Sequence, residues 1–167
     1  MIIISNPIDL SKVFRDLYQV KADTADAQMH TGDLVETILK TYTIPAGTLG
    51  ITGVVRIKVT GISRGNNGAK TYKLKLGGTI IATLTVDADV SDLHWTLFAA
   101  CHNLGAVDSQ GWSAYWQQSL FGNDINETAV ASALDTASDQ DLVITGELAN
   151  VADECEVRDW TIEINPT

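Results

Sequence analysis

The chain has 167 residues, of which 45% are hydrophobic and 19% are charged, a balance typical of one folded domain with a sizeable core. Its formal net charge of -10 argues against nucleic acid as a partner, because phosphate binding requires clustered Lys and Arg. No apolar run approaches the roughly 18 residues that span a bilayer, so we expect no membrane partner.

The first 34 residues differ from the remainder, and we interpret residues 1–34 as an N-terminal arm and linker. Pro7 can open a helix, and four apolar residues follow it at helical spacing, namely Leu10, Val13, Phe14 and Leu17. This spacing predicts a short helix over residues 8–18, with a polar linker over residues 21–33. Because such an arm is too small to form a core of its own, we expect it to pack on its own domain or on a neighbouring protein.

From residue 35 onward the hydrophobic period changes to two, which indicates β-strands. Eight strand-like runs follow at residues 36–44, 54–60, 70–76, 80–86, 93–101, 112–120, 142–148 and 156–164, and a shorter one is expected near residues 127–131. The glycine pair at residues 77–78 predicts a hairpin between the third and fourth runs, and Gly65-Asn66-Asn67-Gly68 is a strong turn sequence. In the third run, Tyr72, Leu74 and Leu76 face one way, and the lysines are assigned to the other face, which Lys70 fits less well.

Eight or nine short strands with no helical pattern between them predict an all-β, antiparallel β-sandwich over residues 35–167. The strand count favours the jelly-roll type. An immunoglobulin-like Greek key stays open at this point, because the order of the strands in space cannot be read from the sequence.

No set of catalytic residues is evident, so we expect no enzymatic activity, no cofactor and no metal. His94 and His102 lie on one predicted strand, about 26 Å apart if it is straight, and His30 lies in the predicted linker. Three acidic clusters are interpreted as solvated loops, namely Asp87, Asp89 and Asp92; Asp135, Asp139 and Asp141; and Asp153, Glu154 and Glu156. A Ca²⁺ site is the alternative, although the turn glycine and the closing glutamate of a calcium loop are missing from the first cluster.

The two cysteines, Cys101 and Cys155, fall within predicted strands, and their spacing matches no zinc or redox motif. We interpret them as buried free thiols. A disulfide stays open only if the two strands face each other with their Cα atoms within about 7 Å.

Aromatic residues concentrate in the run at residues 112–120. Trp112 and Trp116 share one face of this strand, whereas Tyr115 points to the other. Three interpretations of the two tryptophans stay open: the sandwich core, a subunit interface, or a platform on which a glycan stacks.

Three stretches of the sequence resemble the jelly-roll modules of tailed-bacteriophage virion proteins. They are Thr41–Gly50 followed by Val55–Gly61, then Lys70–Thr79, and finally Thr145–Glu154. The resemblance covers about residues 37–164 and concerns strands and turns rather than catalytic residues. Such modules occur in head decoration (cement) proteins and at the ends of head and tail fibres. The resemblance implies a jelly roll, a homotrimer and a place on the virion surface.

A fibre shaft would show heptads, collagen-like triplets or β-helical repeats, and the sequence contains none of them. We therefore expect a capsid decoration protein on the capsid surface, whose arm binds the major capsid protein and stabilises the head shell. The alternative is a fibre tip that binds a host-cell glycan receptor, with Trp112 and Trp116 as the platform.

Overall fold

The computed structural model describes residues 27–118 and 133–165 in full, together with the backbone of residues 19–23. The helix expected over residues 8–18, with Leu10, Val13, Phe14 and Leu17, lies outside these residues, as does the strand expected near residues 127–131. The described residues form strands and no helix, and they include no helical segment with the length and apolar character of a membrane span.

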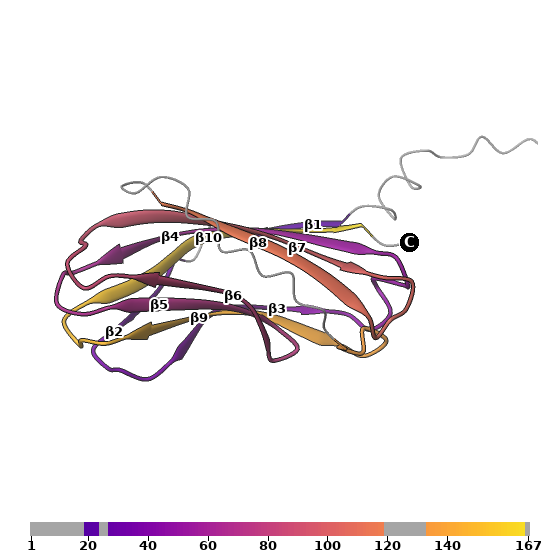
Figure 1. Cartoon of the computed structure of the whole chain (residues 1–167), viewed down its shortest axis with the longest axis horizontal. Helices are drawn as coiled ribbons and strands as arrows, with labels where there is room; N and C mark the ends of the chain where they lie inside the picture. Colours follow the sequence, from indigo (N-terminus) through magenta and orange to yellow (C-terminus); the bar gives the residue numbers. More distant parts are fainter. Residues whose placement is uncertain (1–18, 24–26, 119–132, 166–167) are drawn as a thin grey trace, which may run out of the picture.

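Two antiparallel sheets face each other across one core, with most of sheet A uppermost in Figure 1 and sheet B below it. Sheet A contains β1 (Gln19–Asp23), β2 (Gln28–Thr31), β4 (Val54–Arg64), β7 (Leu93–Asn103), β8 (Gln110–Gln118) and β10 (Glu154–Asn165). Sheet B contains β3 (Thr37–Ile44), β5 (Lys70–Leu76), β6 (Thr79–Val86) and β9 (Gln140–Leu148).

The strand order identifies the sandwich as a jelly roll. It is β1-β10-β4-β7-β8 in sheet A, with β2 also paired to β10, and β3-β9-β5-β6 in sheet B. Apart from the hairpins β5–β6 and β7–β8, consecutive strands from β2 onward lie in opposite sheets, and late strands insert between early ones. This double Greek-key order confirms the predicted jelly roll and differs from an immunoglobulin-like arrangement.

The eight main runs expected from the sequence are all strands, and the hairpin at residues 77–78 is confirmed. Gly77 and Gly78 both adopt positive φ angles, 52° and 81°, which glycine tolerates without a steric penalty. Several strands are longer than the sequence pattern predicts, such as β4, which continues to Arg64.

The boundary expected at residue 35 is wrong, because sheet A begins earlier. Gln19–Asp23 pairs with residues 160–164 of β10, and Gln28–Thr31 pairs with residues 154–157 of the same strand. His30 therefore lies in β2 and not in a linker. These short strands pair with the edge of the sheet through backbone hydrogen bonds, which do not depend on the side chains. Their sequences are mostly polar and show no hydrophobic period, so the sequence pattern did not reveal them.

An aromatic cluster occupies the core. The ring of Trp95 lies 4.5 Å from that of Tyr72 in sheet B and 5.2 Å, edge to face, from that of Trp116. A Cβ atom at Gly61 would overlap the Trp95 ring, so β4 requires a glycine where it crosses this indole. Aromatic pairs in this arrangement stabilise a core beyond the area that they bury.

The orientation of Lys70 differs from the prediction, which assigned this side chain with the other lysines to the solvent face of β5. It shares the phase of Tyr72 and points inward, and its side chain is 0% exposed. The ammonium lies 3.7 Å from Oδ2 of Asp153 and donates hydrogen bonds to the carbonyl oxygens of Gly65 and Val90. A buried lysine is tolerated only with partners of this kind.

Asp153 holds the turn that joins the two sheets between β4 and β5. Its carboxylate accepts hydrogen bonds from the backbone and side chain of Asn67 and from the backbone of Gly68. Burial alone would raise the pKa of Asp153, but these hydrogen bonds and the charge of Lys70 outweigh it, so the pKa is lowered. Since this pKa is lower in the folded state, its stabilising effect is present above about pH 4 and is lost as the pH falls further.

We predict that Asp153→Asn lowers the free energy of unfolding by about 3–5 kcal/mol, because it leaves the buried Lys70 ammonium without its counter-charge. Urea denaturation at neutral pH measures the loss. The control is Asp89→Asn, which removes the same charge from an exposed loop and should change stability by no more than about 0.5 kcal/mol. Equal stability of the two variants would contradict the role given to the buried pair.

Candidate functional site

The two tryptophans that the sequence offered as an interface or glycan platform are core residues. Trp112 is 4% exposed and Trp116 is 0% exposed, since both point from β8 toward sheet B, where β6 packs against β8. The platform and interface interpretations are therefore wrong for these side chains, and the core interpretation is confirmed. The reason is that β8, although it is an edge strand, has its inner face covered by the second sheet.

The histidines do not come together. His94 and His102 are exposed at opposite ends of β7, opposite Ile62 and Val54 respectively, and His30 is buried in β2. Within residues 27–118 and 133–165, no three His, Cys, Asp or Glu side chains are grouped so that they could hold a metal ion.

The acidic clusters are used in different ways. Asp87, Asp89 and Asp92 are exposed in the β6–β7 loop. Asp139 and Asp141 accept hydrogen bonds from the backbone of Ala46 and the hydroxyl of Thr43. In the third cluster Asp153 is buried, and Glu154 and Glu156 both pair with Arg64. These contacts give the second and third clusters structural roles.

Cys101 and Cys155 are free and buried, as expected from the sequence. Burial raises the pKa of the Cys101 thiol to about 12 and that of the Cys155 thiol to about 11, so neither is a ready nucleophile at neutral pH.

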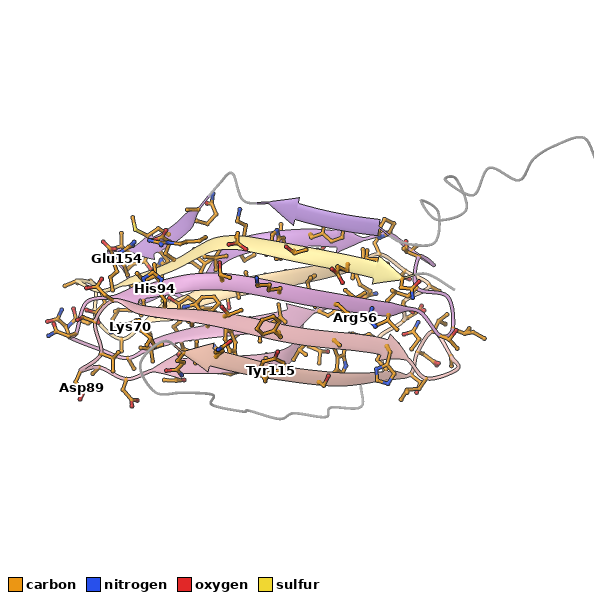
Figure 2. The ribbon with its side chains drawn as sticks, turned by 90° about the horizontal axis from the view of Figure 1, so that it is seen from above. Arg56, Lys70, Asp89, His94, Tyr115 and Glu154 are labelled. Atoms are coloured by element: carbon orange, nitrogen blue, oxygen red, sulfur yellow. The ribbon has the colours of Figure 1, made fainter. Side chains whose placement is uncertain are left out.

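The outer face of sheet A carries ordered rows of polar and aromatic side chains. Figure 2 looks onto this face and labels Arg56, His94 and Tyr115 on it. Antiparallel register aligns β10, β4, β7 and β8 so that one row contains Glu163, Arg56, Ala100 and Ser113. The next row contains Thr161, Lys58, Phe98 and Tyr115, and the third contains Asp159, Thr60, Thr96 and Gln117. Neighbouring rows are about 7 Å apart along the strands.

A hollow of about 520 Å³ lies where the first row meets the second. Ala100 and Ser113 are small, so the surface drops beside the taller Phe98 and Tyr115. Two neighbouring strands supply most of the remaining lining. β4 contributes Arg56 and Lys58, and β10 contributes Thr161 and Glu163.

Phe98 and Tyr115 form a stacked pair with ring centroids 4.9 Å apart and ring planes inclined by 17°. Register places Phe98 between Tyr115 on one side and Lys58 on the other, whose ammonium lies 6.0 Å from the Phe98 ring centroid. Tyr115 is 45% exposed and therefore offers both ring surface and a hydroxyl group to a ligand.

A second hollow of about 530 Å³ continues the same face toward the third row. It is more polar, with His94, Gln117 and Arg158 in its lining. On its β10 side, the hydroxyl of Thr60 donates a 2.6 Å hydrogen bond to Asp159, next to an irregularity in the β10 register.

Sequence reasoning missed Phe98 and gave no role to Tyr115. The strand period did show that Tyr115 points away from Trp112 and Trp116, so burial of the tryptophans would have placed it outside. Nothing local connects Phe98 to Tyr115, because their contact depends on the β7–β8 register.

No protein-family model matches this sequence, and no curated protein does. Among solved structures, arcelin-5, a lectin-like defense protein from Phaseolus vulgaris, is similar with a TM-score of 0.50 and 5% identity, over 90% of this chain and 100% of that one. A Bauhinia forficata lectin in complex with GalNAc gives a TM-score of 0.47 at 8% identity, over 90% and 99% of the two chains. The CBM2 module of the evolved Dit of Lactobacillus casei BL23 phage J-1 gives a TM-score of 0.41 at 11% identity, over 76% of this chain and 69% of that one. At such identities, the likeness to arcelin-5 supports the β-sandwich fold alone.

We predict that Trp116→Ala lowers the free energy of unfolding by about 3–5 kcal/mol, since it empties a fully buried site. Tyr115→Ala, one residue away on the opposite face, should lose only about 1 kcal/mol of stacking with Phe98. Urea denaturation of both variants compares them, and similar losses would contradict the assignment of the two faces.

Proposed function

We propose that this chain is a carbohydrate-binding module of a tailed-bacteriophage virion, and that the outer face of sheet A binds the glycan. The observation that carries the proposal is the stacked pair of half-buried Phe98 and exposed Tyr115, beside a mainly apolar hollow that polar side chains border. A sugar-binding site requires this combination: a flat apolar surface next to groups that form hydrogen bonds.

The chemistry of the hollow suits a sugar ring. A pyranose has apolar C–H faces, which pack on aromatic rings, and hydroxyl groups around its rim. Here Tyr115 supplies the ring, and Ser113 and Thr161 supply hydroxyl groups that both donate and accept hydrogen bonds. The second hollow, with Gln117 and His94, extends the face for further sugar units.

The number of carboxylates in the hollow favours a binding function over glycoside hydrolysis. Glycosidases place two carboxyl groups across the scissile bond, about 5–9.5 Å apart. Among the described residues that line the first hollow, Glu163 is the one carboxylate. The phage assignment is supported by the sequence resemblance over about residues 37–164.

We predict that Tyr115→Ala weakens glycan binding about five- to twelvefold, because the sugar loses its stacking surface, worth about 1–1.5 kcal/mol. Tyr115→Phe keeps the ring and should retain most of the affinity. The matched control is Ile80→Ala, which truncates a side chain of similar exposure, 47% against 45%, on sheet B. A glycan array followed by titration calorimetry of the best ligand measures the effect, and unchanged affinity of Tyr115→Ala would exclude this face.

Attachment to the capsid is a second proposal. Exposed apolar side chains concentrate between β2 and the start of β3, with Met29, Leu34, Val35 and Ile38 all more than half exposed. Such a concentration favours contact with another protein. We propose that this region and residues 1–18 bind the major capsid protein and that the attached form is a homotrimer.

Deleting residues 1–18 should abolish co-sedimentation with capsid shells, while all the strands from β1 to β10 remain in the chain. The control is Tyr115→Ala in the full chain, which should still co-sediment. Undiminished sedimentation of the shortened chain, or a monomer mass for the full chain on the shell, would reject this mode of attachment.

A further inference from the structure

Arg56 and Lys58 differ from the other basic residues that the structure describes. Neither forms an ion pair with any described carboxylate. By contrast, a carboxylate lies within 4 Å of each of five others, namely Arg64, Lys70, Lys73, Lys75 and Arg158, and Lys40 is engaged as well. Arg56 and Lys58 occupy adjacent outward positions of β4, and both line the first hollow.

This situation is unusual because acidic groups are abundant. The chain has 21 Asp and Glu against 11 Lys and Arg, so a cation on its surface readily finds a partner. Glu163 lies opposite Arg56 in the β4–β10 register, and yet the two side chains form no ion pair. Lys58 contacts the ring of Phe98 instead. The lining thus carries two cations and one carboxylate, a local excess of positive charge.

We propose that the first hollow selects acidic saccharides, with the carboxylate or phosphate group of the sugar bound by Arg56 and its ring packed on Tyr115. This inference rests on the proposed function and adds the ligand class. A guanidinium is suited to the role, because its planar fork can donate two parallel hydrogen bonds to one carboxylate or phosphate group.

The spacing fits a small acidic sugar. Arg56 and Tyr115 lie two strands and one row apart, so their Cα atoms are separated by roughly 12 Å. Their side chains narrow this gap to the size of one or two sugar rings, and Ser113 lies beside it. Lys58, the next outward residue after Arg56 on β4, adds a second positive charge in the row of Tyr115. A long polyanion is disfavoured, because the net charge of -10 repels it beyond the hollow.

The test titrates the full-length protein with methyl glucuronide, methyl glucoside and glucose 6-phosphate, and with acetate and inorganic phosphate alone, followed by ¹H–¹⁵N NMR. We expect at least one of the two acidic sugars to bind about tenfold more tightly than methyl glucoside, with shifts at Arg56 and Tyr115. The preference should fade in about 1 M salt, where the Debye length is about 3 Å. Comparing the affinity for methyl glucuronide with that for glucose 6-phosphate shows whether the site prefers a carboxylate or a phosphate group.

Arg56→Gln should remove the preference for the acidic sugar, so that this variant binds the acidic sugar and methyl glucoside with affinities within about twofold of each other. Arg56→Lys should restore part of the preference. Lys75→Gln removes the same charge from the outer face of sheet B, where Lys75 pairs with Glu36, and should leave the preference unchanged.

Equal affinity for acidic and neutral sugars would overturn this inference and leave the proposed function intact. Acetate or phosphate binding as tightly as the sugars would overturn it too, because the sugar ring would contribute nothing. If no sugar shifts the signals of Arg56 or Tyr115, the proposed function fails as well.

Discussion

The antiparallel register of sheet A is the constraint on which the rest of the structure depends. Side chains alternate between the two faces of a strand, so the pairing of β7 with β8 turns Trp95 and Trp116 inward and Phe98 and Tyr115 outward at the same time. A slip of one residue would expose the indoles and bury polar residues. The core and the candidate site are therefore two results of one set of backbone hydrogen bonds.

A second constraint acts where the chain passes between the sheets. The β4–β5, β6–β7 and β9–β10 connections all contribute to one buried ion pair, since Gly65 and Val90 accept hydrogen bonds from Lys70 and the third connection carries Asp153. Three crossovers of the jelly roll are thus joined by a single pair of charges. Because this pair is buried at one end of the sandwich, it does not involve the side chains on the outer faces of the two sheets, and the charges on those faces can differ.

The two outer faces do differ in how their charges are used. On sheet B, Lys73 and Lys75 share Glu36, and the two ammonium groups lower the pKa of its carboxyl group to about 2. Those charges satisfy one another and stabilise the sheet. On sheet A, Arg56 and Lys58 border a hollow without such partners. The contrast within one small domain is the physical basis for assigning ligand binding to sheet A.

The sequence by itself determined most of the strands and which residues share a face, because apolar residues recur there with a period of two. That Tyr72 lies on the face of Leu74, and that Tyr115 lies opposite to Trp116, follows from this alternation alone. It did not determine β1 and β2, which exist only through backbone pairing with β10. It also left open whether the tryptophans were core or surface, since parity does not say which face the second sheet covers. The hollow was decided by tertiary structure alone, because Arg56, Phe98 and Tyr115 come from three strands that only the register brings together.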